Sequence, residues 1–209
     1  MKSHARVVVI GGGVVGVSTL YHLTKKGWSD VVLLERTELT AGSTWHAAGL
    51  LPLFNMSYTV GQLHKYSVDL YKRLPAETGQ DVSFHVTGNL RLATCRDRMD
   101  EYRKYCGTAN TIGVPFQLIS PAEVKELWPL VNLGGDADTP AVIGALYHPD
   151  DGHIAPADLT MALRKAARSA GAAINEQTEV TAAVQMPGGE WKLTTNKGEI
   201  TAEHVVLCT

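Results

Sequence analysis

Three glycines near the start of the chain have the spacing of a phosphate-binding turn. Gly11, Gly13 and Gly16 form a G-x-G-x-x-G pattern, and Glu35 follows 19 residues after the last of them. In such a turn the first glycine allows a sharp bend, the second lets the backbone approach a pyrophosphate, and the third lets a helix pack closely on a strand. A carboxylate at the end of the next strand can accept hydrogen bonds from a ribose. The pattern predicts dinucleotide binding and does not distinguish NAD from FAD.

A second candidate segment runs from Thr40 to Leu50 and consists mostly of small residues. Its backbone N–H groups and hydroxyls could line the rest of an extended cofactor, whereas a simple NAD domain would continue with another helix and strand. His46 is a nucleophile near neutral pH, and Trp45 could either wall a flat ring or pack inside the protein. The segment therefore favours FAD over NAD, and a cofactor-lining loop over a mobile linker.

The residues around the glycines predict a β-α-β unit that positions them. Arg6–Ile10 and Val31–Leu34 are short apolar runs typical of buried strands. Val14–Lys26 between them has helical periodicity, and Gly27 is placed to end that helix. Together they have the length of a right-handed crossover. The unit places the glycines where the helix begins and Glu35 where the second strand ends.

The rest of the chain mixes helices and strands. After the small-residue segment we predict a helix over about Ser57–Leu74, ended by Pro75; a strand over Phe84–Leu92; a helix over Arg96–Ile112; a strand over Phe116–Ile119; a helix from a capping box at Ser120 and Glu123 to Pro129; and a strand over Val142–Tyr147. Then follow a helix over Pro156–Ala170 and strands over Ala172–Glu176, Val180–Gln185, Glu190–Thr194, Glu199–Ala202 and Val205–Cys208.

These elements predict an α/β fold in which a Rossmann-like FAD-binding domain, a βαβ unit plus a β-meander, carries an inserted α+β substrate-side piece. We expect the FAD-binding domain to be discontinuous, over residues 1–80 and 153–209, and the inserted subdomain to cover residues 81–152. A strand at the last residues is an unusual place for a domain to end. We therefore expect this chain to be the first part of a longer polypeptide, truncated at its C-terminus.

Composition excludes several classes of protein. Lys and Arg number 19 against 21 Asp and Glu, so no basic surplus indicates nucleic acid or an anionic membrane as partner. The longest apolar runs, Val7–Ile10 and Val31–Leu34, are far shorter than the ~20 residues of a membrane helix. Cys95, Cys106 and Cys208 are too few for a disulfide framework or a zinc site. We expect no bound metal. We also expect a reducing, cytoplasmic compartment, unless the chain is a trimmed organellar precursor.

The sequence resembles the FAD-binding half of the dimethylglycine and sarcosine dehydrogenase family, within the D-amino-acid-oxidase-like flavoproteins. The residues that carry the resemblance are Gly11-Gly-Gly-Val-Val-Gly16, Leu33-Leu-Glu-Arg36, Thr40-Ala-Gly-Ser-Thr-Trp-His-Ala-Ala-Gly-Leu50, Glu77-Thr-Gly79, Gly88-x-x-Arg-Leu-Ala93, Leu127-x-Pro-Leu130 and Asp151-Gly-His153. They extend over essentially the whole chain, and the Ser-Thr-Trp-His stretch is the most specific of them.

The resemblance implies a set of cofactor residues. In the family the histidine of the Trp-His pair bonds covalently to the 8α-methyl group of the flavin, and His46 occupies that position. The full predicted FAD set, together with the glycine pattern, is Gly11, Gly13, Val14, Val15, Gly16, Glu35, Arg36, Gly42, Ser43, Thr44, Trp45, His46, Ala47, Ala48, Gly49, Leu50 and Val180.

The resemblance also implies oxidative N-demethylation of a small methylated amine such as dimethylglycine. A hydride passes from the N-methyl carbon to flavin N5, and the iminium that forms is hydrolysed or its carbon is captured by tetrahydrofolate. The electron acceptor would be electron-transfer flavoprotein or O2, and a trimmed eukaryotic precursor would lie in the mitochondrial matrix. The family's acid/base groups and folate-binding domain follow residue 209, so no catalytic residue is assigned.

Several alternatives stay open. The substrate could be sarcosine or another amine, or the chain could match the non-catalytic regulatory subunit of pyruvate dehydrogenase phosphatase, although a regulatory scaffold has no need for His46. His148 and His153 flank an Asp-Asp pair that could suggest a metal, but their spacing favours a solvated turn. Arg91 could meet a substrate carboxylate or simply lie on the surface.

Overall fold

A computed structural model describes residues 2–209, which form two compact units. The first unit comprises the residues up to Gly49 together with Arg73–Ser83 and Ala155–Thr209, and the second comprises Leu50–Lys72 and Phe84–Ile154. The predicted domain boundaries placed residues 50–72 with the first unit. The structure places them in the second, because Leu50–Leu51 pairs with a strand of that unit and Val68 belongs to one of its apolar clusters.

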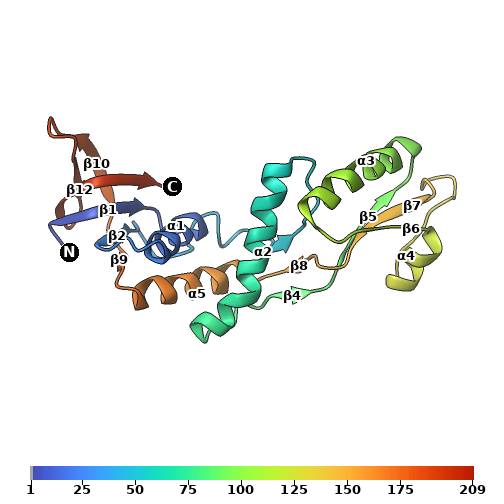
Figure 1. The fold of residues 1–209 in the computed structure, drawn as a ribbon, viewed down its shortest axis with the longest axis horizontal. Coiled ribbons are helices and arrows are strands. Elements are labelled where there is room, and N and C mark those ends of the chain that lie inside the picture. The colour runs from blue at the N-terminus through green and yellow to red at the C-terminus, as the bar shows by residue number, and fades with distance from the viewer. Residues whose placement is uncertain (1) are drawn as a thin grey trace. The chain divides into compact units, whose positions relative to one another are not determined.

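The first unit is built on a six-stranded sheet (Figure 1). Its strand order is β10 (Val180–Gln185), β11 (Trp191–Thr195), β12 (Gly198–Leu207), β1 (His4–Ile10), β2 (Val31–Leu34) and β9 (Ala173–Asn175). Strand β1 runs parallel to both β2 and β12, and β9 is parallel to β2, whereas β10, β11 and β12 form an antiparallel meander. The parallel centre brings the carboxyl ends of β1 and β2 to one edge of the sheet.

Helices α1 (Val14–Lys25) and α5 (Pro156–Ser169), with the last residues of α2 (Tyr58–Thr78), complete the first unit. Helix α1 contacts β1, β2 and helix α5, beside which it lies in Figure 1. Its buried face consists of Gly16, Val17, Leu20 and Tyr21. All four residues of β2 are buried, as a strand covered on both faces requires. The predicted β-α-β unit is therefore confirmed, with the helix ending one residue earlier than predicted.

The prediction for the last strands was wrong in one respect. Glu199–Ala202 and Val205–Cys208 were expected as two strands, but they belong to the single strand β12. The first half of β12 pairs with β11 on one side, and the strand pairs with β1 on the other as far as Leu207. Leu207 is 71% exposed, so the apolar end of β12 is not buried.

The second unit contains two small antiparallel sheets. One has the order β3 (Leu50–Leu51), β8 (Gly152–His153), β4 (His85–Val86), and the other β5 (Asn89–Ala93), β7 (Gly144–His148), β6 (Gln117–Ile119). Its helices are α3 (Arg96–Ile112), α4 (Pro121–Leu127) and the first part of α2 (Tyr58–Thr78). Helix α4 begins with the predicted capping box between Ser120 and Glu123, and the bounds of α3 are those predicted.

Two predictions in this part of the chain were wrong. The single strand expected over Phe84–Leu92 is two strands, because the backbone turns at Gly88 (φ +73°) and the N–H groups of Thr87 and Gly88 donate to the carbonyl of Asp151. Helix α2 continues to Thr78 rather than ending before Pro75. Proline lacks a donor but keeps its acceptor, and Gly79 N–H donates to the Pro75 carbonyl at 2.8 Å.

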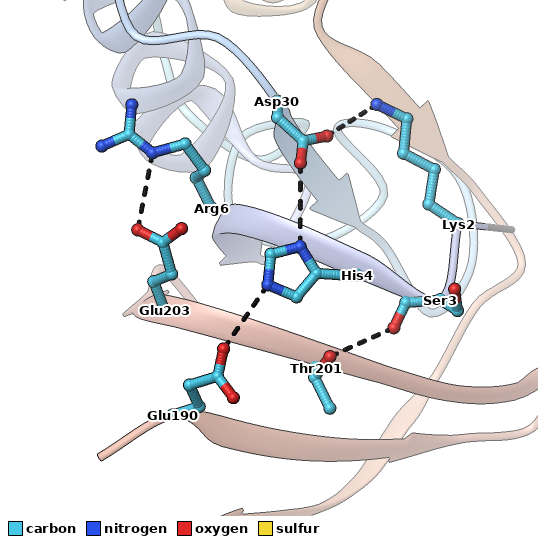
Figure 2. A network of polar contacts seen from close by, with 8 residues as sticks. All are labelled: Lys2, Ser3, His4, Arg6, Asp30, Glu190, Thr201 and Glu203. Carbon is cyan, nitrogen blue, oxygen red and sulfur yellow. Dashed lines mark hydrogen bonds and ion pairs between the residues drawn. The ribbon is translucent and has the colours of Figure 1, made fainter. Parts of the chain in front are cut away.

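A network of charged and polar side chains, here called the amino-end network, lies at the amino ends of β1 and β2. Its members are Lys2, Ser3, His4, Arg6, Asp30, Glu190, Thr201 and Glu203 (Figure 2). Lys2 Nζ lies 2.7 Å from Asp30 Oδ1, and Arg6 Nε lies 3.4 Å from Glu203 Oε2. The Arg6 guanidinium also stacks on the Trp28 ring, at 4.8 Å from its centroid. The charged groups of this network therefore pair with one another at the solvent surface.

Within residues 2–209, no helix is both long enough and apolar enough to cross a membrane.

Candidate cofactor site

The glycine turn, residues 11–16, is held by close backbone contacts. Gly11 has φ +115° and donates its N–H to the Leu34 carbonyl at 2.9 Å. A Cβ on Gly11 would lie 2.4 Å from the Cys208 carbonyl oxygen, and one on Gly16 would lie 2.0 Å from the Gly11 carbonyl oxygen. These two glycines are therefore required for the chain to turn and for α1 to approach β1.

Gly13 is less crowded than Gly11 and Gly16, whose added Cβ atoms would lie against backbone atoms. It is the N-cap of α1, with an extended backbone, and a Cβ there would have only Thr44 Oγ1 within 4 Å, at 3.1 Å. A side chain at this position would require the Thr44 hydroxyl to shift by a few tenths of an ångström, so the fold opposes it less than at Gly11 or Gly16. A ligand lying against the start of α1 would demand glycine here, which is the role that the spacing predicted for the second glycine.

The first turn of α1 offers donors to such a ligand. The first N–H groups of any helix have no partner within it, and they carry partial positive charge. The Val14 N–H donates to Thr44 Oγ1 at 2.9 Å, whereas those of Val15 and Gly16 have no protein acceptor within residues 2–209. Thr44 is buried and anchors the small-residue loop to α1. The sequence contained no signal for this contact, since a threonine in a loop is unremarkable.

Glu35 is fixed at the edge of the glycine turn. Its Oε2 accepts the Gly12 N–H at 2.7 Å, and its Oε1 accepts the backbone N–H and the hydroxyl of Thr37 at 2.8 and 3.1 Å. An ionised carboxylate has about four acceptor positions. Three protein donors leave roughly one position, on Oε2, for a ribose hydroxyl. The contribution of Gly12, the unassigned residue of the glycine pattern, was missed by the sequence analysis.

The segment before β10 lies beside Glu35. The Gln177 N–H donates to the Thr37 carbonyl at 2.8 Å, and the Thr178 N–H donates to the Glu35 carbonyl at 2.7 Å. Val180, two residues further on, packs against the apolar cluster that contains Leu34. The structure therefore brings the segment that contains Val180 to the end of β2, although the two are far apart in sequence.

The small-residue loop, residues 40–50, is folded rather than extended. Thr40 has φ +71° and donates its N–H to the Gly12 carbonyl at 3.1 Å, which ties the loop to the glycine turn. The Trp45 N–H returns to the Thr40 carbonyl at 3.1 Å. Most of the loop's predicted contact residues are exposed, namely Gly42, Ser43, Trp45, His46, Ala47 and Ala48. Arg36 is exposed beside Glu35, whereas Leu50 begins the second unit.

His46 lies in this loop with one ring nitrogen engaged. Its Nδ1 is 3.1 Å from the Gly42 carbonyl oxygen, which can only accept a hydrogen bond. Nδ1 must therefore carry the proton, and the lone pair of the neutral ring is on Nε2. Trp45, its neighbour, is 71% exposed and does not pack inside the first unit. The loop thus presents an indole ring and an imidazole nitrogen to solvent.

A buried polar cluster in the second unit was not foreseen. Asn89, Arg91, His148 and Asp151 each have a buried nitrogen or oxygen atom without a hydrogen-bond partner. The solvated turn predicted around the Asp-Asp pair was wrong for two residues, since His148 is 0% and Asp151 1% exposed. Among the described residues, no three His, Cys, Asp or Glu side chains are arranged to hold a metal ion.

Burial sets the protonation of this cluster. It raises the pKa of Asp151 to about 6, against the opposing effects of the Leu53 N–H and the Arg91 charge. It lowers the pKa of His148 to about 4. The Pro115 carbonyl opposes that second shift but lies outside regular hydrogen-bond geometry. His148 is therefore a neutral imidazole at neutral pH.

Comparison with known proteins agrees with the geometry of the first unit. Residues 6–209 match the family described as FAD dependent oxidoreductase. The chain is 44% identical over 205 residues to mitochondrial dimethylglycine dehydrogenase of Rattus norvegicus, covering 98% of this chain and 23% of the rat protein. The predicted family is confirmed, and its cofactor is FAD rather than NAD.

Other relatives have different activities. The chain is 36% identical to the mitochondrial pyruvate dehydrogenase phosphatase regulatory subunit of Mus musculus, covering 100% of this chain and 23% of that protein. It is 38% identical to 4-methylaminobutanoate oxidase (formaldehyde-forming) of Paenarthrobacter nicotinovorans, covering 99% and 24%. The chain thus spans about a quarter of the length of these curated relatives.

A solved structure supports the fold. The crystal structure of L-proline dehydrogenase from P. horikoshii superposes with a TM-score of 0.90 at 32% identity, covering 100% of this chain and 54% of that one. The predicted α/β fold of an FAD-binding oxidoreductase is therefore confirmed.

Proposed function

The chain belongs to the family of FAD-dependent oxidoreductases, and from this premise we propose that it binds FAD at the carboxyl ends of β1 and β2. The observation that carries the proposal is that a Cβ on Gly13 would meet a single protein atom within 4 Å, Thr44 Oγ1 at 3.1 Å, at the start of a helix. The pyrophosphate would lie there against the first turn of α1. Glu35 would accept a ribose hydroxyl on its remaining acceptor position, and the segment with Val180 would lie near the adenine.

We further propose that His46 carries the flavin covalently. The hydrogen bond from its Nδ1 to the Gly42 carbonyl leaves Nε2 as the free nucleophile, exposed on a loop that is tied to the glycine turn. That bond also fixes the orientation of the ring. The proposed attachment atom is Nε2, which would replace one hydrogen of the 8α-methyl group, with the oxidised flavin ring taking up the two electrons and solvent the released protons.

The proposed reaction of the full-length protein is oxidative N-demethylation of a small methylated amine resembling dimethylglycine. FAD, when bound, accepts the hydride of an N-methyl carbon. The substrate iminium then takes up water to release formaldehyde and the demethylated amine, or passes its one-carbon unit to tetrahydrofolate bound by a further domain. Residues 2–209 contribute contacts that hold the cofactor. These contacts fix the orientation in which the flavin meets the substrate.

The electron acceptor we propose is electron-transfer flavoprotein or O2. Because the rat and mouse relatives are described as mitochondrial, the mitochondrial matrix is proposed for a trimmed eukaryotic precursor, and the cytoplasm otherwise. The likeness to a phosphatase regulatory subunit supports a second candidate, a non-catalytic scaffold. His46 has no use in such a scaffold.

An absorbance spectrum of the purified full-length protein separates these candidates. A flavin spectrum that bleaches when dimethylglycine is added under anaerobic conditions supports the dehydrogenase. A colourless protein, or one whose flavin is not reduced by any methylated amine tested, contradicts it and favours the scaffold.

A further inference from the structure

A groove lined by basic side chains, here called the α5 groove, lies in the first unit between helix α5 and the segment that follows helix α2. Its volume is about 440 Å³, and it is lined by Gln80, Met161, Arg164, Lys165, Arg168 and Ser169. A second hollow of about 440 Å³ shares Lys165 and Ser169 with it and extends to Tyr21 and Lys25 of helix α1. Cavities of this size are typical of small-molecule sites.

Three cations stand close together on α5 with little compensating charge. Arg164, Lys165 and Arg168 lie within five consecutive residues, and the two arginines, four residues apart, share a helix face where like charges repel. Lys165 and Arg168 are exposed, and within residues 2–209 neither side chain has a hydrogen-bond or ion-pair partner. The C-terminal end of a helix favours a basic side chain, which accounts for Arg168 alone. An anion bound in the α5 groove would relieve the repulsion.

Arg164 is partly buried, and the protein satisfies its guanidinium poorly. Its Nε is buried without an acceptor, and its Nη1 has only the Met161 sulfur, at 4.0 Å. Its Nη2 lies 3.8 Å from Glu176 Oε1, which is too long for a hydrogen bond. A guanidinium carries five N–H donors, and leaving a buried donor without an acceptor is costly. Arg164 therefore has donors available to a ligand in the α5 groove.

The carboxylate that lines the second hollow is already paired. Glu77 Oε2 lies 2.9 Å from Lys25 Nζ and accepts the Tyr21 hydroxyl at 2.9 Å. The hydrogen bonds from Lys25 and Tyr21 hold the pKa of Glu77 below its ordinary value, so the carboxylate stays ionised and its charge is balanced by Lys25. Lys25 and Lys165 line the same hollow, yet only Lys25 has a carboxylate. The protein therefore leaves the positive charge of the α5 groove uncompensated.

We propose that the α5 groove binds a small molecule that carries a phosphate group, at a site separate from the one proposed for FAD. A phosphate offers several acceptor oxygens and more than one charge, and guanidinium groups pair with it through two parallel N–H donors. A single carboxylate would leave two of the three cations uncompensated. Lys25, in the adjoining hollow, follows Val14 by eleven residues, so about 16 Å of helix separates it from the start of α1. The ligand is therefore not the pyrophosphate of FAD.

The test is a calorimetric titration of inorganic pyrophosphate into the purified full-length protein. The groove variant combines Lys165→Gln with Arg168→Gln. The matched control combines Arg6→Gln with Lys192→Gln, which removes the same charge from paired residues outside the α5 groove. We expect saturable binding to the wild type, binding roughly 10- to 100-fold weaker in the groove variant, and unchanged affinity in the control. Arg164→Lys should also weaken binding, because lysine lacks the paired donors.

The other outcomes contradict the proposal. Equal affinity in wild type and groove variant overturns it, because pyrophosphate then binds elsewhere, as at a glycine turn that holds no FAD. An equal loss in the control overturns it too, since net charge alone would then govern binding. Absence of saturable binding to the wild type means that the cations are only solvated. If a hexaglutamate peptide binds and pyrophosphate does not, the groove takes an acidic protein segment instead. Lys165→Gln alone decides the matter if the double variant does not fold.

Discussion

At the carboxyl end of β1 the chain turns through glycines and presents backbone N–H groups, whereas at the amino end of the same strand charged side chains pair with one another. At the carboxyl end the Glu35 carboxylate is bound by the turn itself. The amino end has three carboxylates, and each lies within 4 Å of a basic side chain (Figure 2). The amino end is completed by ion pairs between its own side chains, whereas the carboxyl end presents backbone N–H groups at the start of a helix.

The difference shows how to separate a binding site from a surface network. Exposed ion pairs contribute about 0–1 kcal/mol each, since solvent competes for both partners. Backbone donors at a helix start, beside a glycine whose Cβ position is approached by a single protein atom, have no such internal explanation. The contrast predicts that changes at the carboxyl end alter cofactor binding strongly, and that changes at the amino end alter it little.

The largest effect is expected from Gly13→Val. Its side chain would enter the space proposed for the pyrophosphate, so the full-length variant should be purified without flavin. We expect the fold to survive, because the one crowding atom, Thr44 Oγ1 at 3.1 Å, has to shift by only a few tenths of an ångström. Visible absorbance measures flavin content, and circular dichroism checks the fold. Gly16→Val is the contrasting variant, expected to misfold because its Cβ would lie 2.0 Å from a carbonyl oxygen. Full flavin occupancy in Gly13→Val would show that the phosphates lie elsewhere.

The next effect concerns His46→Ala, which should convert covalent FAD into dissociable FAD. The glycine turn and Glu35 remain intact in this variant, so it should still bind the cofactor. After acid precipitation the colour of the wild type should stay in the pellet, and that of the variant should move to the supernatant. If both proteins release flavin equally, His46 does not carry the flavin covalently. That result would not contradict the proposed FAD-binding site.

A smaller effect is expected from Glu35→Gln. Glutamine keeps the size and one acceptor for the Gly12 N–H but loses the charge that strengthens a hydrogen bond to ribose. A loss of about 1.5–3 kcal/mol corresponds to FAD binding roughly 10- to 100-fold more weakly. Since a covalent cofactor cannot dissociate, the change is made in His46→Ala, and both apo proteins are titrated with FAD. Equal dissociation constants would mean that Glu35 does not touch the ribose.

The smallest effect belongs to the amino end. Asp30→Asn removes the partner of Lys2, at a position whose side chain is 33% exposed, and should cost at most about 1 kcal/mol of unfolding free energy with FAD affinity unchanged. The hydrogen bond from Lys2 holds the pKa of Asp30 below its ordinary value. That stabilisation is therefore present above the unfolded pKa and is lost as the pH falls through the folded pKa. The stability difference between wild type and variant should shrink in acid. A large change in FAD affinity in Asp30→Asn would contradict the expected difference between the amino and carboxyl ends of β1.

The sequence predicted the first unit better than the second, for a physical reason. The strands Val31–Leu34 and His4–Ile10 and helix α1 are specified by local apolar patterns and by glycines with fixed roles. The contacts that complete the site, from Thr44 to Val14 and from Glu35 to Gly12, join residues more than twenty positions apart. No local pattern encodes such pairs.

The second unit was harder to predict because some of its buried polar residues lie in a stretch of sequence typical of exposed turns. His148 and Asp151 sit beside a proline and another aspartate, which is typical of a solvated turn. Tertiary packing buries them instead, and it also leaves Arg91 half-buried against Phe54. Strand pairing across Gly88 likewise depends on the distant carbonyl of Asp151.

The most direct test of the central claim, that this chain holds FAD through its first unit, is to map flavin onto the peptides of the full-length protein. Trypsin should release residues 37–65 as one peptide, which contains His46 and His64. Mass spectrometry should find the flavin adduct on this peptide alone, and fragmentation should place it on His46. An adduct on any other residue, or protein without either bound or released flavin, would contradict the account.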